Sequence, residues 1–176
     1  GNMEKLGYKL CPYDHMASSI KWCKSLTDYI NLFLNWMVTP GENSTDFSTI
    51  LFDFEFVYGE IKIKDALESA IYQKSKSNTL FYDFLGNKVL KLPEGLTFFK
   101  KIAIEESGDK KDFFDLKQKG LQVYIDAARL FALSHNLKGV NNTYLRYKQL
   151  AITDAKNAEK YLDFAENYLQ LQHFPL

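Results

Sequence analysis

The stretch DLKQKGLQVYIDAARLFALSHNLKGVNNTYLRYKQ, residues 115–149, decides the fold of this chain. From Leu121 to Leu133 its apolar residues fall on more than one side of a helix, so we predict a helix that packs on several faces. Asp126 and Arg129 interrupt this apolar surface three residues apart, on one side of the helix. Because burying a charge is costly, the pair indicates either a well-satisfied network or a functional cleft.

Arginine is rare in this chain. Arg129 and Arg146 are the only arginines among 22 basic residues, and both lie in this stretch. A guanidinium group offers a planar fork of donors that suits a carboxylate or a phosphate, and lysine cannot reproduce that geometry. Two interpretations follow: a structural bridge from Asp126 to Arg129 that locks two helices, or a polar wall that faces a ligand.

Length and composition narrow the class of protein. A chain of 176 residues with 46% hydrophobic content can form one well-packed domain, or one domain and part of another. Its net charge of zero gives no overall attraction for nucleic acid or for an anionic membrane. No stretch has the apolar length of a membrane span and no signal-peptide pattern opens the chain, so we expect a cytoplasmic protein.

Cysteine and histidine predict no metal site. Cys11, His15 and Cys23 fall short of a four-ligand zinc site, so we expect two reduced thiols. The opening Gly1-Asn2-Met3 is no native start, and we expect Gly1 to remain from a cleaved expression tag on an excised part of a longer protein.

Helical periodicity covers most of the sequence. The predicted helices are residues 18–37, 62–74, 79–91, 96–106, 115–136, 143–151 and 154–173, the last with Thr153 as its N-cap. Residues 4–15 look irregular, with a short strand near 8–10. The predicted fold is mainly α: an antiparallel helical bundle at 60–176, preceded at 1–59 by a small α/β portion with one or two strands.

Residues 48–58, STILFDFEFVY, predict the clearest strand. Phenylalanines alternate with Asp53 and Glu55, so the aromatic rings and the two carboxylates should face opposite sides. Two adjacent carboxylates repel each other unless a cation or a proton lies between them. The pattern fits either a strand that presents acids to a cleft or an edge strand with a polar face.

Three blocks in this order resemble a known family. They are FDFEFVYGE at 52–60, LTFFKKIAIEESGDKKDFFDLKQKGLQVYIDAARLFAL at 96–133 and NNTYLRYKQL at 141–150. Together they resemble bacterial nucleotidyltransferases of the DUF294 type, whose pattern runs FDFR-x-VYGD, then DLK-x-x-GL-x-x-x-VDLARLYAL, then NT-x-x-RL. Residues 6–29 also resemble the end of that family's catalytic domain. Glu55 departs from the pattern, which usually carries arginine there.

The resemblance implies a modular protein. In such proteins a nucleotidyltransferase domain precedes a helical substrate-binding domain, often behind CBS or cyclic-nucleotide-binding domains, and some relatives act in signal transduction. Catalysis of that kind needs a glycine-rich turn and an Asp-x-Asp pair for Mg²⁺ and a nucleoside triphosphate. Neither motif occurs here, so the resemblance implies that the cofactors serve only the full-length enzyme. Asp53 would be its third carboxylate, and the residues expected to bind or brace substrate are Asp115, Lys117, Asp126, Arg129 and Arg146.

Three functional hypotheses remain. The leading one is a module that binds and positions the substrate of a nucleotidyltransferase, with an upstream catalytic domain as its partner and an unknown acceptor. The second is a helical protein-interaction or regulatory module without a small-molecule site, which should show a closed core and an exposed apolar patch. The third, an independent metallohydrolase that uses Asp53, Glu55 and His15, lacks any pattern that fixes these residues as a ligand set.

Overall fold

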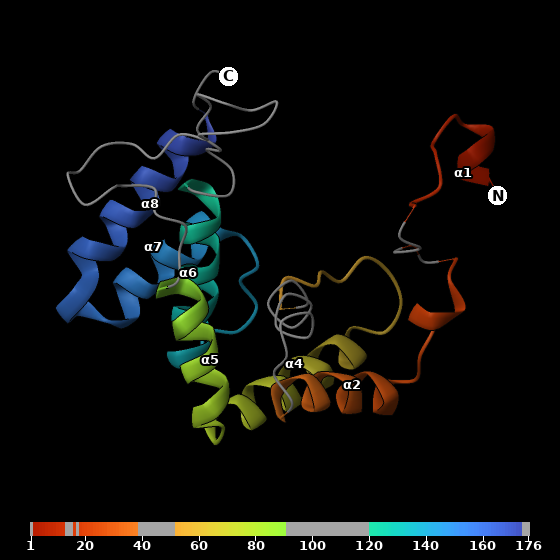
Figure 1. Ribbon diagram of the computed structural model, residues 1–176, viewed down its shortest axis with the longest axis horizontal. Helices are drawn as coiled ribbons and strands as arrows, with labels where there is room; N and C mark the ends of the chain where they lie inside the picture. Colours follow the sequence, from red (N-terminus) through yellow and green to blue (C-terminus); the bar gives the residue numbers. More distant parts are fainter. Residues whose placement is uncertain (1, 13–15, 17, 39–51, 91–119, 174–176) are drawn as a thin grey trace, which may run out of the picture.

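The computed structural model describes residues 2–12, 16, 18–38, 52–90 and 120–173, and these are mainly helical (Figure 1). The N-terminal part contains α1 (Asn2–Lys5), the 3-10 turn η1 (Ile20–Trp22) and α2 (Leu26–Val38). The remainder contains α4 (Ile61–Lys76), α5 (Thr79–Leu90), α6 (Gln122–Ser134), α7 (Thr143–Thr153), the 3-10 turn η3 (Ala155–Asn157) and α8 (Ala158–Gln172). The prediction of a mainly helical chain is therefore confirmed.

Helix α6 lies between two apolar cores. Leu133 belongs to the core shared with α2, α4 and α5, whereas Ala128 belongs to the core shared with α7 and α8. The first core comprises Phe33, Met37, Phe52, Ile71, Tyr72, Phe81, Leu85 and Leu133, and the second comprises Ala128, Tyr147, Leu150, Tyr161 and Ala165. This position explains why residues 121–133 are apolar on more than one side.

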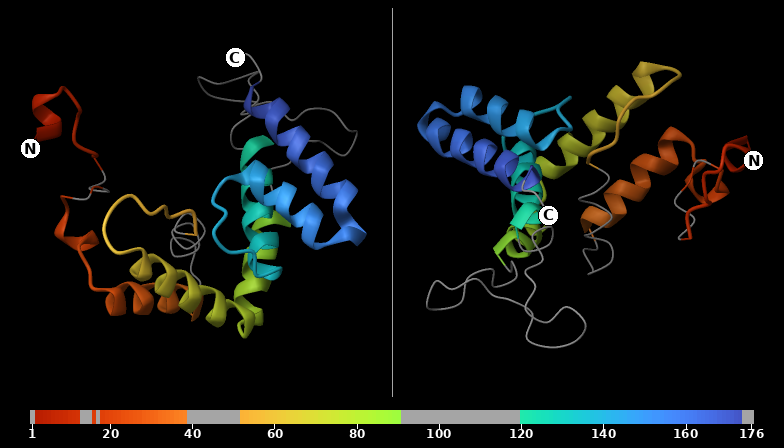
Figure 2. Two further views of the ribbon diagram at one scale, coloured as in Figure 1. Left: turned by 180° about the vertical axis from the view of Figure 1, so that it is seen from behind. Right: turned by 90° about the horizontal axis from the view of Figure 1, so that it is seen from above.

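The two cores hold differently oriented helices. Figure 1 shows α2 and α4 running together across the molecule, while α5 and α6 stand upright beside them, and both views of Figure 2 place α7 and α8 on the far side of α6. Helix α1 lies at the opposite end of the molecule from α8 (Figures 1 and 2). The helices thus gather in two groups, and α6 contributes to both.

Helix α6 ends in a Schellman motif. Asn136 adopts a left-handed φ of 56°, which asparagine tolerates better than most residues. The amide of Asn136 donates to the carbonyl of Leu133, and the amide of Leu137 donates to that of Ala132 at 2.8 Å. These bonds satisfy the last carbonyls of the helix and turn the chain toward α7.

Helix α7 begins after Asn142, its N-cap, and ends later than predicted. The side chain of Asn142 accepts a hydrogen bond from the amide of Leu145 at 3.0 Å, and this bond caps the helix. Thr153 was expected to cap the last helix, but it is the final residue of α7. Its hydroxyl donates to the carbonyls of Gln149 and Leu150. That prediction was wrong because the Thr153 hydroxyl finds its acceptors within its own helix.

The strand prediction for 48–58 was wrong for the residues that the structure describes, 52–58, which form no ladder, and residues 8–10 form none either. In the former segment, side chains take the carbonyls that a ladder would use: Arg146 donates to Phe52 and Asn141 donates to Phe54. The alternation itself is real. Phe52 and Phe54 pack with the first core, while Asp53 and Glu55 accept hydrogen bonds from residues of α6 and α7 and from the loop between them. The pattern therefore reflects a single segment packed on two sides, and the expected α/β portion is absent from the described residues.

The helices predicted at 62–74, 79–91, 143–151 and 154–173 agree with α4, α5, α7 and α8 to within a few residues. The helix predicted at 18–37 begins only at Leu26, after the 3-10 turn η1, so the prediction was wrong for its first eight residues. The predicted helix at 115–136 corresponds to the shorter α6, and the predicted helix at 96–106 lies outside the described residues. Among the helices described, none combines the length and the apolar character needed to cross a membrane.

Tyr72 should make stability depend on alkaline pH. Burial raises the pKa of Tyr72 to about 12 from the ordinary tyrosine value of 10.0, and its hydroxyl donates to the carbonyl of Leu137. The folded state then holds this proton more tightly than the unfolded state, so the contribution is complete below pH 10 and is lost as the pH rises toward 12. By pH 11 the loss should reach about 1.4 kcal/mol.

The comparison is between the parent chain and Tyr72→Phe in urea unfolding from pH 8 to pH 11. Tyr72→Phe should be less stable by about 1 kcal/mol at pH 8, because it lacks the hydrogen bond, and this difference should vanish near pH 11. Tyr58 is 96% exposed, so Tyr58→Phe is the matched control, and its free energy of unfolding should follow that of the parent at every pH. A pH-independent difference between the parent and Tyr72→Phe would contradict the prediction.

Candidate functional site

Asp53 is the point at which the two arginines meet. Arg129 of α6 donates from Nε to Asp53 Oδ2 at 2.8 Å, and its Nη2 donates to the same oxygen. Arg146 of α7 donates from Nη1 to the other oxygen, Oδ1, at 2.6 Å. One carboxylate therefore ties the segment at 52–55 to both helices, although 76 and 93 residues separate it from the arginines in sequence.

The remaining guanidinium nitrogens also have protein acceptors. Arg129 Nη1 donates to Asp126 Oδ1 at 2.9 Å. Arg146 Nε donates to the carbonyl of Val140 at 2.7 Å, and its Nη2 donates to that of Phe52 at 3.3 Å. Two positive charges thus face two carboxylates, and within the described residues no buried side-chain nitrogen or oxygen lacks a partner. Arg146 is only 2% exposed, and a charge buried in this way is costly unless an opposite charge and hydrogen bonds compensate it. The carboxylates and carbonyls around the two arginines provide this compensation.

Helix α4 holds the loop between α6 and α7. The Tyr72 hydroxyl donates to Leu137, and the Gly139 amide donates to the Glu68 carboxylate at 2.6 Å. Gly139 has a φ of 73°, a left-handed conformation that favours glycine. Lys64 binds the other oxygen of Glu68 at 2.9 Å, and this hydrogen bond raises the pKa of Lys64. The loop is therefore fixed on the side that faces α4.

Asn141 fixes the loop on its other side. Its Nδ2 donates to the carbonyl of Phe54 at 2.7 Å and to Glu55 Oε2 at 2.8 Å. The segment at 52–55 is therefore attached through both of its acids, by Asp53 to the arginines of α6 and α7 and by Glu55 to the loop between these helices. This attachment sets the position of Glu55 relative to α7.

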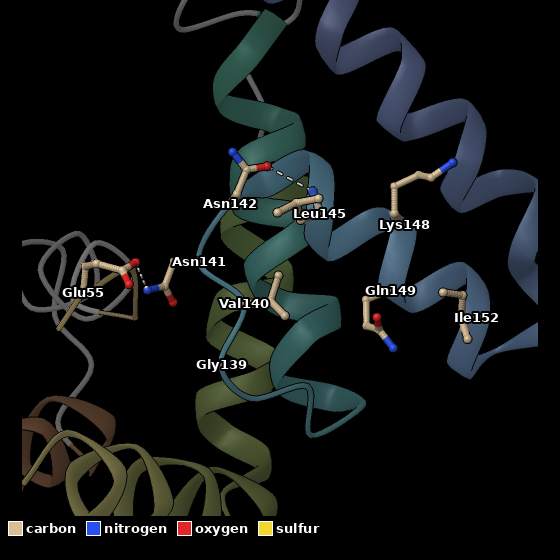
Figure 3. Close-up of a pocket in the computed structure, with 9 residues that line it drawn as sticks. All are labelled: Glu55, Gly139, Val140, Asn141, Asn142, Leu145, Lys148, Gln149 and Ile152. Atoms are coloured by element: carbon tan, nitrogen blue, oxygen red, sulfur yellow. Dashed lines mark hydrogen bonds between the residues drawn. The ribbon is translucent and has the colours of Figure 1, made fainter. Parts of the chain in front are cut away.

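A cavity of about 390 Å³ opens beside this attachment (Figure 3). The loop between α6 and α7, the outer face of α7 and the side chain of Glu55 form its walls. The lining residues are Glu55, Gly139, Val140, Asn141, Asn142, Leu145, Lys148, Gln149 and Ile152. Its size falls within the range of small-molecule sites, about 300–1,000 Å³. The cavity combines an apolar wall with a few polar groups, which is the usual composition of such a site.

Comparison with known families accounts for most of the chain. Residues 79–176 match the family described as putative nucleotidyltransferase substrate binding domain, DUF294_C, and this match covers more than half of the sequence. The chain belongs to the DUF294_C family. Residues 1–43 match a second family, putative nucleotidyltransferase DUF294. Searches of curated proteins and of solved structures gave no match.

The family match and the site coincide in part. Both arginines and all cavity residues except Glu55 lie within the DUF294_C segment at 79–176. Asp53 and Glu55 lie between the two matched segments. The cavity is thus mainly a feature of the DUF294_C segment, and Glu55 is added to it from outside.

The structure brings together four of the residues that the sequence singled out. Asp53, Asp126, Arg129 and Arg146 form one ion-pair network, in which the side chain of Asp53 is 25% exposed and the others are buried. Their donors and acceptors face one another across the contact between the 52–55 segment and the helices. Asp115 and Lys117 lie outside the described residues. A role for these six residues in catalysis or substrate binding stays a prediction.

Sequence reasoning missed the cavity residues. The sequence predicts no binding role for Asn141, and Lys148 and Gln149 fall only within the helix predicted at 143–151. The available signal was the block NNTYLRYKQL, which the resemblance included and which contributes Asn141, Asn142 and most of the α7 wall. A second signal was the spacing of Leu145 and Ile152, which are seven residues apart and therefore share one face of the helix. In the structure both side chains are largely exposed.

Asp53 is a poor ligand for the Mg²⁺ that the family resemblance implies. Two guanidinium groups bind its two oxygens, and they would repel a divalent cation placed there. The described residues contain no group of three or more acidic, histidine or cysteine side chains that could hold a metal ion, and Cys11 and Cys23 form no disulfide. The residues around Asp53 therefore do not fit a bound Mg²⁺.

Arg129→Met should destabilise the chain by about 3–5 kcal/mol, because it leaves the carboxylates of Asp53 and Asp126 without their shared counter-charge. Adding Asp126→Leu should recover part of this loss by removing one of the two acids. Equilibrium unfolding in urea measures both variants. Lys160→Met, at an exposed position on α8, is the matched control and should change stability by no more than about 0.5 kcal/mol. An Arg129→Met loss as small as that of the control would contradict the network's structural role.

Proposed function

We propose that this chain is the substrate-binding module of a nucleotidyltransferase and that the cavity on α7 receives the acceptor substrate. The single observation behind this proposal is the overlap of cavity and family. The segment that matches the substrate-binding family, residues 79–176, supplies every wall of the cavity except Glu55.

The ion-pair network gives the cavity a fixed geometry. Arg129 and Arg146 hold Asp53, and Asp53 lies two residues before Glu55 on the same short segment. Arg146 also binds the carbonyl of Val140, a residue of the cavity wall. In this proposal the arginines position the site, and the lining residues contact the substrate. A site held by buried ion pairs needs little reorganisation when it binds its ligand.

The groups that transfer the nucleotide would come from an upstream nucleotidyltransferase domain. Nucleotidyl transfer depends on placed metal ions and on groups that bind the triphosphate. In this proposal Mg²⁺ and the nucleoside triphosphate bind to that domain, and CBS or cyclic-nucleotide-binding domains would regulate it. The full-length protein would then act in the cytoplasm of a bacterium, in signal transduction.

One observation favours a second candidate function, a helical protein-interaction module. Val57 and Tyr58 are 89% and 96% exposed, and Ile61 and Ile63 are also largely exposed at the start of α4. Four neighbouring apolar side chains in solvent are typical of a contact surface. In this alternative a partner protein covers residues 57–63 and the cavity has no ligand.

A cavity-filling variant tests the proposed function in a protein that contains both the upstream catalytic domain and this chain. Leu145 lines the cavity and is 53% exposed, so Leu145→Trp should occupy the cavity without disturbing a core. Transfer of labelled nucleotide to the acceptor fraction should fall on the order of tenfold to a hundredfold, because the acceptor loses its position. This chain alone should transfer no nucleotide.

Two controls separate the candidates. Leu162→Trp, at a 38% exposed position on α8 outside the cavity, should transfer nucleotide like the parent. Tyr58→Asp should also leave transfer unchanged if the cavity is the acceptor site. Parent-like transfer by Leu145→Trp together with loss of transfer in Tyr58→Asp would instead support the protein-interaction module.

A further inference from the structure

The cavity has a charged end and an apolar wall. Glu55 forms the charged end, and Figure 3 shows its carboxylate beside the amide of Asn141. Val140, Leu145 and Ile152 form the apolar wall. Leu145 and Ile152 are seven residues apart, so they share one face of α7.

Two oxygen acceptors remain for a ligand at the charged end. Glu55 uses Oε2 to accept from Asn141 at 2.8 Å, and its Oε1 has no hydrogen bond to any described residue. The side-chain nitrogen of Asn141 donates its two hydrogen bonds to the carbonyl of Phe54 and to Glu55, which leaves the side-chain oxygen as an acceptor. Both groups accept hydrogen bonds, and one of them carries a negative charge.

The positive groups of the cavity do not cancel this charge. Lys148 lines the cavity, but its ammonium group lies 6.0 Å from the centroid of the Tyr144 ring, and Figure 3 shows it directed away from Glu55. The amide of Leu145, in the first turn of α7, is already capped by Asn142. The end of the cavity formed by Glu55 and Asn141 is therefore suited to a cation.

We propose that the cavity binds a primary alkylammonium group, with the ammonium at Glu55 and Asn141 and the aliphatic stem along Val140, Leu145 and Ile152. An ammonium group has three donors and no acceptor, which matches an end of the cavity that offers two oxygen acceptors. An alkyl stem gains free energy by covering the exposed apolar wall. This assignment rests on the proposed function and specifies its acceptor as an amine.

Calorimetric titration of the 176-residue chain tests the assignment with three probes of similar length: 1-aminopentane, pentanoate and 1-pentanol. The amine should bind at least about tenfold more tightly than the other two, because only the amine forms a charge-assisted hydrogen bond with Glu55. Higher salt should weaken amine binding, since Glu55 is exposed. Equal affinity for pentanoate and the amine would overturn the proposal.

Variants at Glu55 locate the effect. Glu55→Gln should weaken amine binding about tenfold, and Glu55→Arg should shift the preference to pentanoate. Glu166→Gln, an exposed acid on α8, is the matched control and should bind like the parent. In nuclear magnetic resonance spectra of the parent, the amine should shift the side-chain amides of Asn141 and Gln149. Unchanged amine affinity in Glu55→Gln would overturn the proposal.

Two further probes identify the source of the amine. Tighter binding of 1,5-diaminopentane than of Nα-acetyl-lysine methylamide would assign the site to a free amine, and the reverse order would assign it to a lysine side chain. Failure of the proposal can be told apart from failure of the proposed function. If no amine binds but Leu145→Trp still blocks nucleotide transfer, the acceptor site stands and the amine class is wrong. If amines bind as described but Leu145→Trp transfers normally, the cavity is not the acceptor site.

Discussion

The carboxylate of Asp53, held between Arg129 and Arg146, is the contact on which the rest of the site depends. It connects three parts of the chain, the 52–55 segment, α6 and α7, through charge-assisted hydrogen bonds. Removing one member of such a buried set leaves an uncompensated charge, so these residues can be kept or replaced only together. This requirement explains why a chain that otherwise uses lysine has arginine at these two positions.

The contact also determines where the cavity forms. With Asp53 fixed, Glu55 lies within reach of Asn141, and the loop between α6 and α7 is held from one side by this segment and from the other by α4. Arg146 binds both Asp53 and the carbonyl of Val140, so the network and the cavity wall share a residue. The buried network therefore supports the walls of the cavity, and the exposed lining residues form the surface that we propose binds the substrate.

Much of the fold could be predicted from the sequence, because helical periodicity is a local property. The helices at 61–76, 79–90 and 143–153 follow directly from it, as does the pairing of Asp126 with Arg129 three residues apart. Side-chain alternation at 52–58 was not sufficient, since a strand also requires a neighbouring ladder, and here Arg146 and Asn141 bind the carbonyls of Phe52 and Phe54. The partner of the two arginines lies 76 and 93 residues away, and no local pattern identifies it. The cavity, likewise, combines residues from separate segments.

The most direct test of this account is a double-mutant cycle between Asp53 and Arg146, measured by equilibrium unfolding of the parent, Asp53→Ala, Arg146→Met and the double variant. If the two side chains form the contact that joins the 52–55 segment to α7, their coupling free energy should be about 1–3 kcal/mol, and the double variant should lose less stability than the sum of the single losses. Losses that add to within about 0.5 kcal/mol would contradict the central role of this contact.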